Sequence, residues 1–118
     1  MNRIPEDFDL SALVGEDLSQ IRIDQHQIQL HFDKVSIQGG GQVLLEKSGD
    51  SKKIFSGSWL TTCGLDALIG SKVVGWQRRS DFQFSLSFSC ETTLVFVTQE
   101  GPNEDFTILV GEQEFYVL

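Results

Sequence analysis

A short phrase that the chain uses twice constrains its fold more than any other feature. Residues 10–15 read Leu-Ser-Ala-Leu-Val-Gly and residues 65–70 read Leu-Asp-Ala-Leu-Ile-Gly, so four residues recur at an offset of 55 positions. A repeat of this period indicates a duplicated unit. After one inserted residue in the second copy, the apolar residues that follow also correspond: Leu18, Ile28, Leu30 and Phe32 match Val73, Phe84, Leu86 and Phe88. We therefore predict a single domain over residues 1–118 with an internal pseudo-repeat, spanning about 10–56 and 65–118.

Each unit alternates apolar and polar residues. Residues 27–32 read Gln-Ile-Gln-Leu-His-Phe, and residues 82–89 alternate in the same way. Strict alternation is typical of a β-strand that buries one face, whereas residues 92–97 are apolar on both faces, as in a central strand. The pattern predicts a mainly β protein, either an antiparallel sandwich or an open half-barrel of about ten strands from two similar halves.

Turn residues divide the chain between these strands. Each copy of the repeated phrase predicts a short helical turn that ends at a left-handed glycine, and Asp9 is placed to cap the first turn. Residues 39–41 are three glycines that break the strand pattern. We read residues 1–9 as an N-terminal arm, residues 47–53 as a solvated hairpin loop and residues 78–81 as a hairpin corner. Trp59 is expected to fill the seam between the units.

Charge is distributed unevenly along the chain. The net charge is −8, but residues 80–118 carry seven acidic residues and no basic residue. Phosphates would be repelled by such a segment, so nucleic acid is not an expected partner, whereas a basic protein would be attracted over a long range. A solvated acidic surface that only keeps the protein soluble explains the same charge.

Known catalytic and metal-binding patterns are missing from the sequence. Cys63 and Cys90 form no C-x-x-C pair and are expected to be buried free thiols, so we predict no metal site and no cofactor. His26 and His31 lie near Asp24 and Asp33, but the alternation places His31 on the solvent side and His26 falls at a hairpin corner, so a surface position is expected for both. We therefore expect no catalytic residues and no enzyme. The chain also shows neither a secretory h-region nor a membrane-spanning stretch, so a cytoplasmic location without membrane contact is predicted.

The two Leu-x-Ala-Leu-[Val/Ile]-Gly phrases, each followed by hairpins such as Leu30-His31-Phe32 and Leu86-Ser87-Phe88, resemble small bacterial duplicated β-proteins of uncharacterised function. In size and acidity the chain is also similar to immunity proteins of contact-dependent inhibition and related toxin systems. This resemblance implies a toxin inhibitor whose acidic surface covers the active or substrate-binding surface of a basic nuclease.

The function expected from the sequence is therefore non-enzymatic binding of a basic protein, most plausibly a cognate toxin. Complementary charge would speed the encounter and fix the register of such a complex. The alternative is a small-molecule or lipid-binding protein, because a curled sheet with nine Phe can enclose a pocket. The sequence leaves the oligomeric state open. The predicted partner-binding residues are the acidic residues after position 80 and one nearby tyrosine: Asp81, Glu91, Glu100, Glu104, Asp105, Glu112, Glu114 and Tyr116.

Overall fold

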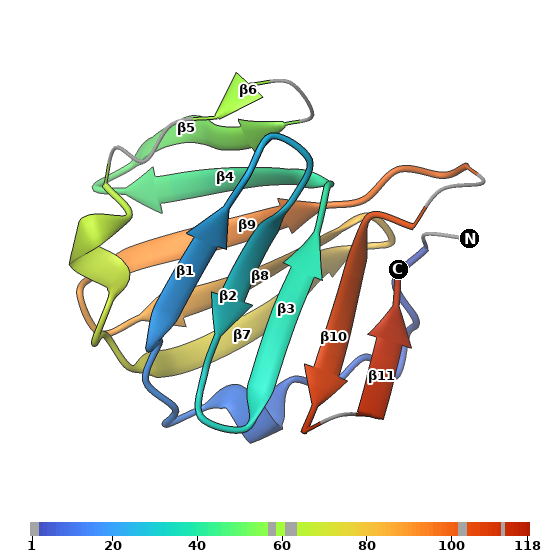
Figure 1. Cartoon of the computed structure of the whole chain (residues 1–118), viewed down its shortest axis with the longest axis horizontal. Helices are drawn as coiled ribbons and strands as arrows, with labels where there is room; N and C mark the ends of the chain where they lie inside the picture. Colours follow the sequence, from blue (N-terminus) through green and yellow to red (C-terminus); the bar gives the residue numbers. More distant parts are fainter. Residues whose placement is uncertain (1–2, 57–58, 61–63, 102–103, 112) are drawn as a thin grey trace.

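Two antiparallel sheets pack face to face and form a β-sandwich (Figure 1). The computed structural model describes residues 3–56, 59–60, 64–101, 104–111 and 113–118, with backbone only at 59, 60, 114 and 115. Of the two arrangements expected from the sequence, the sandwich is the one observed. The described elements are two 3-10 turns, η1 (Ser11–Leu13) and η2 (Asp66–Leu68), and eleven strands: β1 (Gln20–Ile23), β2 (Ile28–His31), β3 (Val35–Gly39), β4 (Gln42–Lys47), β5 (Asp50–Ser56), β6 (Trp59–Leu60), β7 (Val73–Ser80), β8 (Gln83–Phe88), β9 (Thr92–Val97), β10 (Phe106–Val110) and β11 (Gln113–Val117).

Each of the two sequence units contributes strands to both sheets. The five-stranded sheet has the order β1-β2-β3-β10-β11 and the six-stranded sheet the order β6-β5-β4-β9-β8-β7. β7, β8 and β9 are the counterparts of β1, β2 and β3, and β10 and β11 are the counterparts of β4 and β5. When each strand of the five-stranded sheet is replaced by its counterpart from the other unit, the order becomes β7-β8-β9-β4-β5. This is the order of the six-stranded sheet without β6. The units are therefore arranged as a pseudo-dimer that exchanges strands. Their descent from one duplicated sequence stays a prediction.

The two copies of the repeated phrase have the same backbone conformation. Each forms a 3-10 turn, and the residues that follow have closely similar φ and ψ, −64° and 124° at Val14 and −64° and 125° at Ile69. Gly15 and Gly70 then take φ values of 94° and 84°, the left-handed region predicted for them. The segments after the glycines pair with each other through two equivalent sets of hydrogen bonds: Gly15 N to Val73 O, Gly70 N to Leu18 O, Leu18 N to Ser71 O and Val73 N to Glu16 O.

Phenylalanine rings fill the space between the sheets. Phe84 and Phe96, from neighbouring strands of the six-stranded sheet, stack with centroids 4.6 Å apart, and Phe106 from the other sheet meets both rings edge-on. All three side chains are fully buried. The alternation correctly predicted that Phe84, Leu86 and Phe88 are buried on one face of β8. It was wrong at two positions, because Phe82 lies half-buried in the turn before the strand and Ser85, on the face expected in solvent, is buried. The central position of β9, expected from its two apolar faces, is also confirmed.

The N-terminal arm covers one open side of the sandwich. Its described residues, 3–9, form no helix or strand, as expected, but Ile4 and Phe8 are buried. The Phe8 ring contacts Trp76 on β7 at one sheet edge and Tyr116 on β11 at the other, with centroids 6.0 and 4.6 Å away. The arm therefore links the edge strands of the two sheets.

Several predicted boundaries and positions were wrong or fall outside the described residues. β4 and β5 extend through most of the loop predicted at 47–53, because Ser48 and Gly49 alone form the turn with positive φ. β7 likewise continues to Ser80, through the predicted corner. The side chain of Trp59, like Cys63, lies outside the described residues, and Cys90 is half-buried. Neither helical element of the described chain is long and apolar enough to cross a membrane.

One ion pair on the outer face of the six-stranded sheet gives a pH-dependent prediction. Arg79 on β7 donates two hydrogen bonds, of 3.0 and 2.9 Å, to the carboxylate of Glu46 on β4, reaching across the two strands between them. These bonds lower the pKa of Glu46 more than its partial burial raises it.

We expect Glu46→Gln to lower the free energy of unfolding by about 0.5 kcal/mol at pH 7, because the pair is partly exposed. The pKa of Glu46 in the folded protein lies below the ordinary glutamate value of about 4.3. The stabilisation by the ion pair is therefore complete above that value and is lost as the pH falls through the pKa of the folded protein. Urea denaturation of both proteins at pH 7 and at about pH 3 measures this. Glu104→Gln, in an exposed loop, is the control. If Glu46→Gln lowered the free energy of unfolding by as much at about pH 3 as at pH 7, the prediction would be contradicted.

Candidate functional site

Acidic residues gather at one end of the sandwich. Ile28 and Phe106 both pair with Gly39, so the β1–β2 turn and the segment before β10 lie at the same end. The β7–β8 turn lies there too, because Ile4 of the arm bonds to Asp81 while Thr98, after β9, bonds to Phe82. Three connections thus bring together five carboxylates, which we call the acidic end: Asp24, Asp81, Glu100, Glu104 and Asp105.

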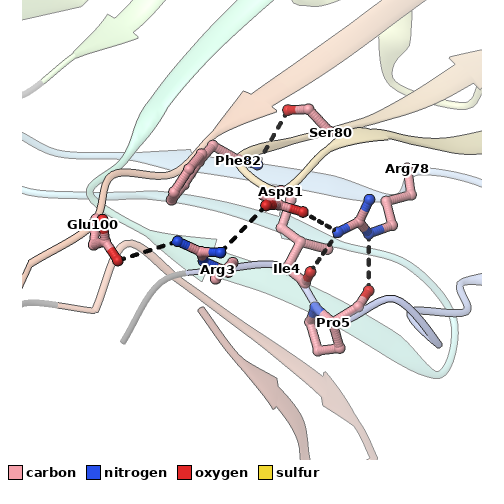
Figure 2. A network of polar contacts seen from close by, with 8 residues as sticks. All are labelled: Arg3, Ile4, Pro5, Arg78, Ser80, Asp81, Phe82 and Glu100. Carbon is pink, nitrogen blue, oxygen red and sulfur yellow. Dashed lines mark hydrogen bonds and ion pairs between the residues drawn. The ribbon is translucent and has the colours of Figure 1, made fainter.

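Figure 2 shows how two of these carboxylates are held by an arginine of the arm. Arg3 lies between Asp81 and Glu100, 3.5 Å from an oxygen of the first and 3.4 Å from an oxygen of the second. Its guanidinium also lies over the Phe82 ring, 5.6 Å from the centroid. The three charged side chains are between 47% and 64% exposed, so this network orders the β7–β8 turn and the 98–105 loop without removing their charge from the surface.

A second arginine fixes the arm beneath that network. Arg78 donates hydrogen bonds to the carbonyl oxygens of Pro5 and Ile4, both at 2.9 Å, and to Asp81 Oδ1 at 2.7 Å (Figure 2). The side chain is mostly buried, so its charge is satisfied by acceptors that the arm supplies. The position of Asp81 is thereby set from both sides, by Arg3 and by Arg78.

Two more carboxylates of the acidic end accept backbone hydrogen bonds. Asp105 Oδ2 accepts from the Gln99 amide at 2.7 Å and closes the loop between the sheets. Asp24 Oδ1 accepts from the amides of His26 and Gln27, and these bonds lower the pKa of the Asp24 carboxyl. Asp24 is therefore ionised at neutral pH. Glu104 is exposed.

The remaining predicted binding residues lie elsewhere. Glu91 is in the β8–β9 turn at the opposite end of the strands, with a left-handed φ of 63°. Glu112 and the side chain of Glu114 lie outside the described residues. Tyr116 packs on Phe8, and its hydroxyl accepts a hydrogen bond from the Asp9 amide at 3.0 Å, so it holds the arm. The predicted set therefore does not form one continuous surface.

Sequence reasoning missed three members of this region. Asp24 was considered only as a neighbour of a histidine, and Arg3 and Arg78 were not considered as site residues. The sequence carries no signal that would join positions 3, 78 and 100, because their contact depends on how the arm crosses the sandwich.

The histidines make no arrangement suited to proton transfer. His26 is exposed and its ring lies 3.1 Å from the Gln25 amide nitrogen, while the His31 ring contacts Gln29. Among the described residues, no three His, Cys, Asp or Glu side chains are placed to hold a metal ion.

Comparison with known protein families, with curated proteins and with solved structures finds no match.

Proposed function

We propose that this protein acts by binding a basic protein through its acidic end, with no catalytic step. The observation that carries the proposal is the convergence of five carboxylates from three separate connections on one end of the sandwich. Asp24, Asp81 and Asp105 are oriented by hydrogen bonds, so little side-chain entropy is lost when they meet a partner. Glu100 and Glu104 lie in the 98–105 loop and are exposed, so they would make the outer contacts.

The partner that fits this surface carries clustered Lys or Arg side chains. Carboxylates can take the place of phosphates on a surface that binds nucleic acid, which is the mode implied by the resemblance to immunity proteins. A cytoplasmic inhibitor of a toxic nuclease is therefore the specific form of the proposal. Binding on the outer surface is favoured over a ligand between the sheets, because the rings of Phe84, Phe96 and Phe106 occupy that space.

The test uses the protein encoded by the neighbouring reading frame, since an immunity gene is expected beside its toxin. We expect the two purified proteins to bind, with an affinity that falls as salt is raised. Glu100→Lys combined with Glu104→Lys should weaken binding by about 100-fold, mainly by placing like charges opposite each other. Titration calorimetry at two salt concentrations measures both effects. Asp81 and Asp105 are left unchanged because they accept the hydrogen bonds that hold the turn and the loop. A thermal transition like that of the unmodified protein shows that the variant stays folded without the Arg3–Glu100 ion pair.

A matched variant separates the site from total charge. Glu91→Lys combined with Asp66→Lys makes the same change in net charge at the opposite end of the sandwich, and should change the affinity by less than about threefold. Equal weakening by both variants would show that only net charge matters, and would contradict the proposed surface. Tight binding that neither variant alters would contradict it as well.

A further inference from the structure

A hollow at the end of the sandwich opposite the acidic end contains two lysines. It lies between the β4–β5 hairpin, the start of β9 and the turn η2, and its volume is about 390 Å³. Its floor is apolar, formed by Leu45 and Ala67. The polar residues that line it are Lys47, Ser48, Asp50, Lys52 and Thr92.

The lysines lie on the side of the sheet that normally carries core residues. Lys47 is two positions after the buried Leu45, and Lys52 pairs directly with Leu45 on the adjacent strand. Alternate residues of a strand, and directly paired residues of neighbouring strands, share a face. Both lysines therefore share the core-facing side of their strands with Leu45.

The structure contains a second hollow in the equivalent place. It lies between β10, β11, the start of β3 and the turn η1, with a volume of about 290 Å³. The strand registers show which residues of the two hollows correspond. Leu45 pairs with Leu94 on one side and with Lys52 on the other. Ile108 takes the same place in the second hollow, where it pairs with Ile37 and with Tyr116. Ala12 of η1 corresponds to Ala67 of η2 through the repeated phrase.

The polarity of the two hollows differs at equivalent positions. The register places Lys47, Lys52 and Thr92 where the other hollow has Val110, Tyr116 and Val35. In that other hollow, Tyr116 is tied to the arm through its bond with the Asp9 amide. Lys47 and Lys52 are exposed at the mouth of their hollow, so the departure from the apolar pattern places two ammonium groups beside solvent.

We propose that the hollow formed by Leu45, Lys47, Asp50, Lys52, Ala67 and Thr92 binds a small organic anion. With two lysines and one aspartate, the residues that form the hollow carry a formal charge of +1, which suits one carboxylate group. The carboxylate would lie between the two ammonium groups, each of which has three N–H donors and can bind it in addition to another partner, and an apolar body would lie on Leu45 and Ala67. The volume is within the range of small-molecule sites, which combine an apolar surface with a few polar groups that fix orientation.

The proposal is tested with octanoate as the probe and octan-1-ol as its neutral counterpart. In amide NMR spectra of the full chain, octanoate should shift the signals of Leu45, Ala67 and Thr92 with a Kd near or below about 1 mM. Octan-1-ol should bind there at least about tenfold more weakly, because it lacks the charge. Lys47→Gln combined with Lys52→Gln should weaken octanoate binding to a similar extent.

Lys34→Gln combined with Lys53→Gln removes the same charge outside the hollow and should leave octanoate binding unchanged. A thermal transition like that of the unmodified protein shows that each variant is folded. Equal binding of octanoate and octan-1-ol, or equal loss in both double variants, would overturn the proposal. If octanoate shifts no signals of the hollow, the lysines act only as inward charges that protect a sheet edge, and the proposal is again overturned.

Discussion

Replacing Phe84 with alanine should lower the free energy of unfolding by about 4 kcal/mol, the largest loss expected for a side-chain truncation in this protein. Phe84 is fully buried and its ring meets three others, those of Phe8, Phe96 and Phe106. The cavity would lie between two sheets that are held apart by the remaining rings, so it cannot collapse easily. Urea denaturation followed by circular dichroism measures the change.

Phe82→Ala is the matched control. Phe82 lies in the turn two residues earlier, where it is half-buried and is covered by Arg3. Its removal should cost about 1 kcal/mol, mostly through the lost contact with the guanidinium. If the two variants were equally stable, the ring cluster would not be the centre of the core.

Gly39→Ala should cost about 3 kcal/mol although it adds a single methyl group. A Cβ atom at this position would overlap the carbonyl group of Asp105, which belongs to the backbone and cannot rotate away. The approach is close because Gly39 pairs with Phe106 where β3 and β10 meet. The residue is glycine because the two backbones leave no room for a side chain.

Gly75→Ala provides the comparison, since a Cβ atom there would have no neighbour within 4 Å. This variant should be as stable as the unmodified protein, or more stable by up to about 1 kcal/mol, because alanine restricts the unfolded chain. Thermal denaturation of both variants would show the contrast. A Gly39→Ala protein with an unchanged midpoint would mean that β3 and β10 do not approach as described.

Much of the fold could be predicted because its signals are local. Alternation identified the buried faces of β2, β8 and their neighbours, and the repeated phrase identified both 3-10 turns with their left-handed glycines. The repeated phrase places Ala12 and Ala67 at equivalent positions of the two hollows, but only the strand registers match Lys47 and Lys52 to Val110 and Tyr116. Local patterns are reliable here because a strand that buries one face must alternate.

The exchange of strands between sheets and the path of the arm could not be predicted. Nothing in residues 35–39 specifies β10 as a partner in preference to a strand of the same unit. The arm reads as polar, yet Ile4 and Phe8 are its buried residues, and Arg78 is needed to satisfy its carbonyl groups. For the candidate site, the sequence predicted the excess of acidic residues after position 80. It did not predict that Glu91 lies at one end of the sandwich and the other described carboxylates at the opposite end, because this depends on the direction in which each strand runs.

The interleaving of the two units has a consequence for synthesis on the ribosome. After the first unit has emerged, β3 and β4 each still lack the neighbour that will cover one edge, since those neighbours are β10 and β9. Unpaired edges of this kind are prone to pair with other chains. The nascent chain therefore keeps the free edge of β4 until β9 has been made and the free edge of β3 until β10 has been made. Association of nascent chains through these two edges is possible during that interval.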